Sequence, residues 1–171
     1  LILRAVSMEF RSKLQGHFWR RFWDWTFFTG SFLATLLFGV AAGNGMIGVD
    51  LDEQSRMTIG ILDLLNPYGI MVGLLAVSMF AMHGAIFLNL KTEGQLREKL
   101  HNWMWHTWGI FLVLYILTTM FTLIAVPRAT ANFERFPWAA AVVVVNVLAI
   151  ANIPRAIFSG KPGQAFLSSA L

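Results

Sequence analysis

The sequence predicts an all-α fold: a polytopic bundle of transmembrane helices with four full spans and parts of flanking helices. Of the 171 residues, 57% are hydrophobic and 13% are charged, which is about half the charged fraction of a typical soluble domain. Mean hydropathy is +0.62, and four stretches reach the roughly 20 apolar residues that a helix needs to cross a bilayer. An ordinary water-soluble globular domain is therefore excluded.

The predicted spans form a single transmembrane domain over residues 1–171, which we interpret as a fragment of a larger subunit. The first span contains Asp24 near its start, and the second contains His83 as its one ionisable residue. Tryptophans crowd the ends of the spans, where aromatic side chains meet the membrane interface. Residues 1–8 and 164–171 are expected to be parts of flanking helices. The four spans cover residues 22–42, 68–90, 103–126 and 138–158.

The positions of Lys and Arg predict the orientation of the spans. Five precede the first span, three lie between the second and third, and two follow the start of the fourth, whereas three lie on the other side. Cytoplasmic loops carry the excess of Lys and Arg, so we expect the chain's start and the loop after residue 90 to face the cytoplasm. The cytoplasmic set is Arg4, Arg11, Lys13, Arg20, Arg21, Lys91, Arg97, Lys99, Arg155 and Lys161, and the outer set is Arg56, Arg128 and Arg135.

Two connecting segments also have recognisable patterns. Residues 10–23 mix basic and aromatic side chains, which is typical of a stretch that lies on an anionic inner leaflet. Nothing in it resembles a nucleic-acid-binding module. In the outer loop, apolar residues at helical spacing predict a short interfacial helix. These residues are Met57, Ile61, Leu64 and Leu65.

Two pairs of glycines at G-x-x-x-G spacing predict close helix packing. They are Gly39 with Gly43 in the first span and Gly69 with Gly73 in the second. Small residues at this spacing let helix backbones approach each other in lipid. The motif is common, so it predicts a contact without naming the partner.

Asp24 is the leading candidate for a functional polar residue, because carboxylates inside membranes are costly and rare. At about 100° per residue, Ser31 and Thr35 lie within about 20° of its direction on the helix. Such a stripe would suit a proton relay. Alternatively, Asp24 pairs with a cytoplasmic base and orders the start of the helix, which is the favoured interpretation. The candidate bases are Arg20, Arg21 and Lys91.

The histidines do not have the pattern of haem ligands. A haem held by two histidines needs both at similar depth, but His83 lies about 10 Å inside its span and His106 about 5 Å, at 1.5 Å per residue. We therefore expect His83, Asn66 and Asn89 to be buried polar residues. No cysteine is present, and no carboxylate–histidine spacing suggests a metal site.

Several motifs, in order and at matching spacing, resemble subunit II of the cytochrome bd quinol oxidases. The similarity is thin over residues 101–153. The matching stretches are residues 9–13 (EFRSK), 23–31 (WDWTFFTGS), 39–48 (GVAAGNGMIG), 65–68 (LNPY), 83–94 (HGAIFLNLKTEG) and 163–169 (GQAFLSS).

The resemblance implies a heterodimeric terminal oxidase of the bacterial inner membrane that oxidises quinol and reduces oxygen to water. It implies two b-type haems and one d-type haem in subunit I, and a haem-free subunit II that stabilises the complex and can shape a proton route. Asp24 is the residue through which such a route would reach this chain. Membrane lipid and small accessory single-span subunits are further expected partners. A secondary transporter or channel is the alternative, since it would fit the same topology.

Overall fold

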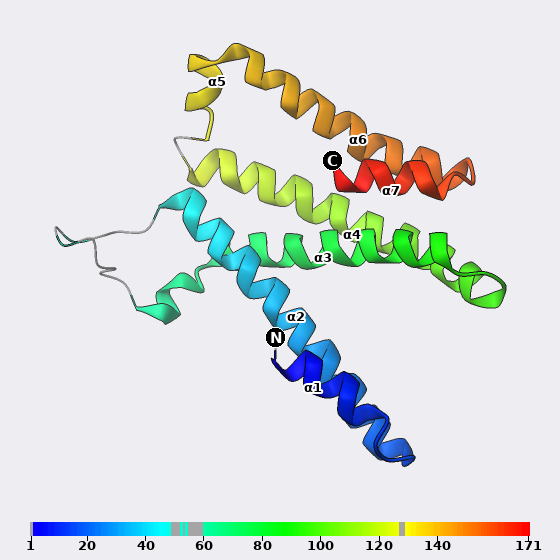
Figure 1. Ribbon diagram of the computed structural model, residues 1–171. Coiled ribbons are helices and arrows are strands. Elements are labelled where there is room, and N and C mark those ends of the chain that lie inside the picture. The colour runs from blue at the N-terminus through cyan, green and yellow to red at the C-terminus, as the bar shows by residue number, and fades with distance from the viewer. Residues whose placement is uncertain (1, 49–51, 53, 55–59, 127–128) are drawn as a thin grey trace.

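A computed structural model describes residues 2–48, 52, 54, 60–126 and 129–171. Within these ranges the chain is helical and contains no strand, which confirms the predicted fold class (Figure 1). Two short 3-10 turns, η1 (Ile61–Leu64) and η2 (Pro137–Ala139), accompany the α-helices. The α-helices are α1 (Ile2–Arg11), α2 (His17–Ile47), α3 (Pro67–Lys91), α4 (Gln95–Ala125), α5 (Ala131–Arg135), α6 (Ala140–Phe158) and α7 (Pro162–Ala170).

Four helical stretches are long and apolar enough to cross a membrane: α2, α3, α4 and the stretch Pro137–Phe158 that contains α6. All four begin before the predicted span, α3 and the last stretch by a single residue and α2 and α4 by more than one turn. α4 starts at Gln95 because polar helix formers precede its apolar part, and Gly94, with φ 67°, makes the turn before it. α2 starts at His17, directly after the extended Gly16.

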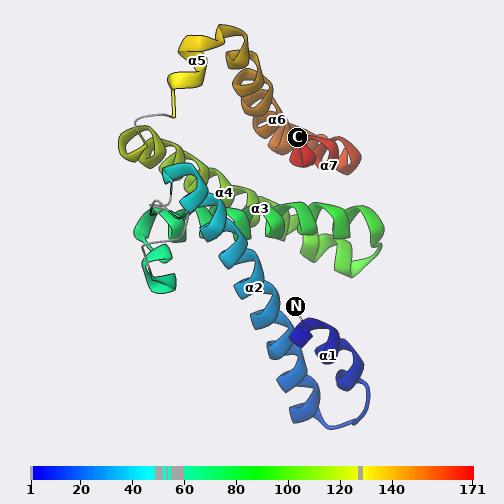
Figure 2. The ribbon, with the colours of Figure 1, turned by 60° about the vertical axis from the view of Figure 1, so that its left-hand side comes forward.

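The long helices alternate in direction along the chain (Figures 1 and 2). α3 and α4 form one antiparallel hairpin, and α6 and α7 form a shorter one beside it. α2 crosses α3 with its C-terminal half, whereas its N-terminal half projects away from the other long helices and packs against α1 (Figure 2). The best-packed core lies where α3, α4, α6 and α7 meet. Its centre is formed by Met82, Ile86, Met104, Ile153 and Ala165, each at most 1% exposed.

The connecting segments differ in part from the prediction. Residues 10–23 comprise the end of α1, a turn and the start of α2, and the turn folds α1 back along α2. Their position on the inner leaflet stays a prediction. In the outer loop, the predicted short helix corresponds to the single 3-10 turn η1. The remainder of that prediction, including Met57 and the side chain of Ile61, lies outside the described residues, as do Arg56 and Arg128 of the predicted outer set.

Candidate functional site

The four glycines of the predicted packing motif lie where α2 crosses α3. Gly39 lies against Gly73, so that a Cβ atom added to Gly39 would be 2.6 Å from the Cα of Gly73. One turn further, a Cβ atom on Gly43 would lie 3.1 Å from the Cα of Gly69. Real Cβ contacts are longer than the first of these distances, so the backbones of α2 and α3 can be this close only because glycine occupies the crossing.

Two asparagines join the same crossing to the outer loop. Asn44, which is 6% exposed, donates from Nδ2 to the carbonyl of Leu64 at 2.7 Å and to that of Val40 at 2.8 Å. Asn66 donates to Oδ1 of Asn44 at 2.7 Å and accepts from the backbone N–H of Gly69 at 2.7 Å. Asn66 therefore caps α3 and holds η1 against α2. Asn66 was predicted as a polar site, whereas Asn44 was noticed only as part of a family motif.

Asp24 lies on the side of α2 that faces α1, where its carboxylate pairs with Arg11. Nε of Arg11 donates to Oδ1 at 2.6 Å, and a second guanidinium nitrogen lies 3.5 Å from Oδ2. Both side chains are about half exposed. The hydrogen bond to Asp24 and the negative charge of Asp24 raise the pKa of the Arg11 guanidinium above its usual value. The ion pair thus exists, but its base is not among the three that were suggested.

The other members of the predicted polar stripe have separate contacts. Ser31 donates to the carbonyl of Phe27, one turn back on α2, at 2.8 Å. Thr35 follows on the same helix, and both side chains are partly buried. Because the hydrogen bonds of Asp24 go to Arg11, a relay from Asp24 to these hydroxyls stays a prediction.

His83 faces α7, where it takes part in a polar contact between two helices. Its Nδ1 lies 2.9 Å from Oγ of Ser169, and its ring packs against Phe166 with centroids 4.8 Å apart. A cavity of about 480 Å³ opens beside it between α3, α4, α6 and α7. Two further polar pairs lie at this junction, namely Tyr115 with Asn146 and Asn152 with Ser168, each at 2.9 Å.

The two histidines weighed as haem ligands have different surroundings in the structure. Nδ1 of His83 is engaged with Ser169. His106, on α4, is exposed, and its Nδ1 lies 2.8 Å from the carbonyl of Asn102 on the same helix. Among the described residues, no three His, Cys, Asp or Glu side chains come together as a metal site. We assign no redox step to these residues.

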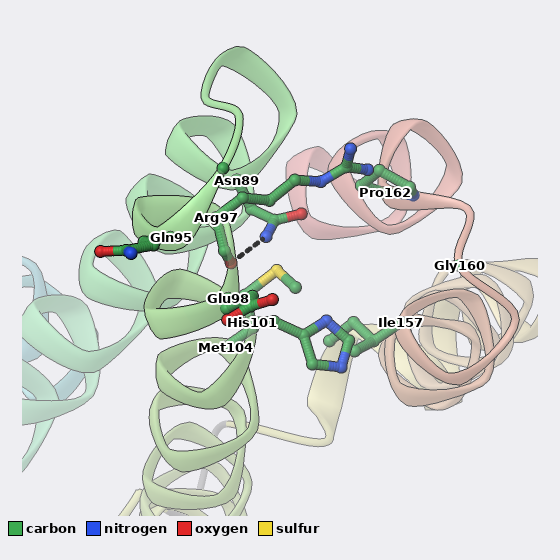
Figure 3. Close-up of a pocket in the computed structure, with 10 residues that line it drawn as sticks. Asn89, Gln95, Arg97, Glu98, His101, Met104, Ile157, Gly160 and Pro162 are labelled. Atoms are coloured by element: carbon green, nitrogen blue, oxygen red, sulfur yellow. Dashed lines mark hydrogen bonds between the residues drawn. The ribbon is translucent and has the colours of Figure 1, made fainter.

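Asn89, the last of the predicted polar residues, lies near the end of α3. It is 4% exposed and donates from Nδ2 to the carbonyl of Arg97 at 3.1 Å (Figure 3). This bond spans the tight turn between α3 and α4. Asn89 therefore fixes the first turns of α4 relative to the end of α3.

Comparison with known proteins points to one family. The family model described as cytochrome bd terminal oxidase subunit II matches residues 1–171. Over 103 residues, 58% of the chain, it is 41% identical to cytochrome bd-I ubiquinol oxidase subunit 2 of Escherichia coli (strain K12) and 39% identical to probable cytochrome oxidase subunit 2 of Haemophilus influenzae. Over 113 residues, 66% of the chain, it is 28% identical to cytochrome bd ubiquinol oxidase subunit 2 of Bacillus subtilis (strain 168). The matched regions cover 27%, 27% and 33% of these relatives.

Proposed function

The chain belongs to the cytochrome bd terminal oxidase subunit II family, and from this premise we propose that it forms part of the haem-free subunit of a bacterial quinol oxidase. The complex would oxidise quinol and reduce oxygen to water in the inner membrane. The observation that carries the proposal is the family match over all 171 residues. The names of the relatives, which are ubiquinol oxidase subunits, support it. The transporter or channel alternative has no such support.

We infer that the chain acts as a helical scaffold for a haem-bearing subunit I. In the apolar windows of the four spans, between 11% and 28% of residues are buried inside the described structure. The remaining apolar surface suits contacts with lipid and with further transmembrane helices. The b-type and d-type haems and the quinol-oxidation site belong, in this proposal, to the partner.

Within this scaffold we assign Asp24 the role of an anchor. Both oxygens of its carboxylate are directed at the Arg11 guanidinium, which suits a fixed contact between α1 and α2. The ion pair joins the end of α1 to the first turns of α2, so it stabilises the hairpin that the two helices form.

Affinity purification through a tag on the full-length subunit tests the proposed function. The native membrane complex should retain haem, show a d-type band in its reduced-minus-oxidised spectrum and consume oxygen when quinol is supplied. The same purification from a strain with the untagged subunit is the control. A purified subunit that carries no haem-bearing partner would overturn the proposal.

A further inference from the structure

A second cavity lies away from the helix crossing and the His83 junction, at the end of the bundle where α3 turns into α4. It measures about 580 Å³ and opens between this turn and the turn from α6 to α7 (Figure 3). Its rim is polar, whereas Met104 and Ile157 contribute buried apolar walls. The polar rim consists of Asn89, Gln95, Arg97, Glu98 and His101.

Arg97 gives this rim an unpaired positive charge. In the ranges that the structure describes, the ion pairs are Arg11–Asp24 and Lys13–Glu9, so no described carboxylate is in direct contact with the Arg97 guanidinium. Its side chain extends from α4 across the cavity toward Pro162 (Figure 3). The bond from buried Asn89 to its carbonyl fixes the backbone from which the side chain extends. A solvent-accessible guanidinium without a protein partner in the described structure is suited to binding an oxyanion.

The surrounding backbone and side chains also favour a negatively charged ligand. α4 and α7 both begin at this cavity, and neither has a side-chain cap on its free N–H groups. The positive ends of two helix dipoles therefore face the site. His101, whose ring points toward Ile157 (Figure 3), adds a hydrogen-bond donor. Glu98 contributes the one carboxylate of the lining and offsets part of this field, while Lys161 immediately precedes α7.

The cavity also lies at the boundary between the polar and apolar parts of the bundle. Gln95 and Arg97 belong to the polar first turns of α4, and Met104 belongs to its apolar part. Lys91 ends α3 at the same boundary. This is the end of the bundle that the Lys and Arg distribution places in the cytoplasm. An occupant in this position meets anionic headgroups on one side and hydrocarbon on the other.

We propose that this cavity binds the phosphate of an anionic phospholipid from the cytoplasmic leaflet. Arg97 pairs with the phosphate, His101 donates to a headgroup oxygen, and Met104 and Ile157 contact the glycerol and the first methylenes. Basic pockets between transmembrane helices on the cytoplasmic side are suited to such headgroups. A free phosphate ion shares the charge but would not use the apolar walls. The proposal does not depend on the oxidase function.

Lipid titration of the delipidated, full-length subunit in its native complex tests the site. Native mass spectrometry counts bound dioleoylphosphatidylglycerol, with dioleoylphosphatidylcholine and inorganic phosphate as the other probes. The wild type should bind phosphatidylglycerol in preference to both. Arg97→Gln removes the charge-assisted hydrogen bond, so the apparent dissociation constant for phosphatidylglycerol should rise by about tenfold or more. Arg97→Lys should keep the preference for phosphatidylglycerol over phosphatidylcholine.

Lys99→Gln is the matched control. It removes one positive charge from the same turns of α4, but Lys99 does not line the cavity, so the dissociation constant should stay within about twofold of the wild type. If Arg97→Gln and Lys99→Gln weaken phosphatidylglycerol binding equally, the effect comes from general surface charge and the proposed site is wrong. Inorganic phosphate that displaces the lipid at equal concentration would overturn the lipid as its occupant. Loss of oxidase activity or haem, without a change in lipid binding, would bear only on the proposed function.

Discussion

At the scale of single residues, several polar side chains of the long helices bind one another across helix contacts. Asp24 was recognised from its position in an apolar helix, but its partner Arg11 could not be. Arg11 precedes Asp24 by 13 residues, and only the turn between α1 and α2 brings the two together. The sequence suggested bases that are close to Asp24 along the chain or on the same predicted membrane face. Neither property determines which base packs against Asp24 in the folded chain.

Replacing Asp24 by Asn should leave oxidase turnover within about twofold of the wild type. The amide keeps the shape and some of the hydrogen bonding to Arg11, and an anchor needs no exchangeable proton. Quinol-dependent oxygen consumption of the purified complex, normalised to haem, is the measurement. If Asp24 instead feeds protons to Ser31 and Thr35, turnover should fall by about tenfold or more.

Arg11→Gln provides the matched control for the Asp24 variant. An anchor predicts that the two single variants and the double variant lower the thermal midpoint of the complex by similar small amounts, because each removes the same pair. Additive losses in the double variant would show that the two residues act separately.

Replacing His83 by Gln should leave the haem spectrum of the complex intact. Nδ1 of His83 contacts Ser169, and an amide can preserve a contact with that hydroxyl. His106→Gln is the companion variant, since His106 is exposed on α4. Loss of a haem signal from either variant, with both subunits still co-purifying, would identify that histidine as a ligand.

At the scale of elements, the crossing of α2 and α3 shows what a spacing motif can and cannot predict. The two G-x-x-x-G pairs predicted that small residues face a neighbouring helix, but the motif does not say which one. The structure pairs them with each other, Gly39 with Gly73 and Gly43 with Gly69. The bond from Asn44 to the carbonyl of Leu64 was not predicted, because no periodic pattern marks a loop carbonyl as an acceptor.

Gly39→Ala should destabilise the complex by about 1–3 kcal/mol, because the new Cβ would overlap the backbone of Gly73 and force the helices apart. Gly84→Ala is the matched control on α3, since a Cβ atom there meets nothing within 4 Å. The thermal midpoint of the solubilised complex and the yield of the partner subunit are the measurements. Equal midpoints for the two variants would contradict close packing at the crossing.

At the scale of the whole chain, the fold class was predictable and the arrangement of helices was not. Hydrocarbon leaves a spanning segment little choice but the helix, so hydropathy alone predicted the four long apolar helical stretches that the structure describes. Hydropathy did not predict where the helices start, because a helix can begin with polar residues, as α4 does after Gly94. Packing partners depend on side-chain shape across segments distant in sequence, and composition does not encode them.

The orientation of the bundle in the membrane can be tested directly, because the 171 residues contain no cysteine. A single cysteine at Asp63, which is exposed in the outer turn η1, should react with a membrane-impermeant maleimide added to intact spheroplasts. A cysteine at Lys161, between α6 and α7, should react only after the membrane is opened. The physical reason is the concentration of Lys and Arg on the side that carries Lys161. The protein without the added cysteine is the control for labelling of any cysteine elsewhere in the full-length subunit. The reverse labelling pattern would show the opposite topology and would place the proposed lipid site in the outer leaflet.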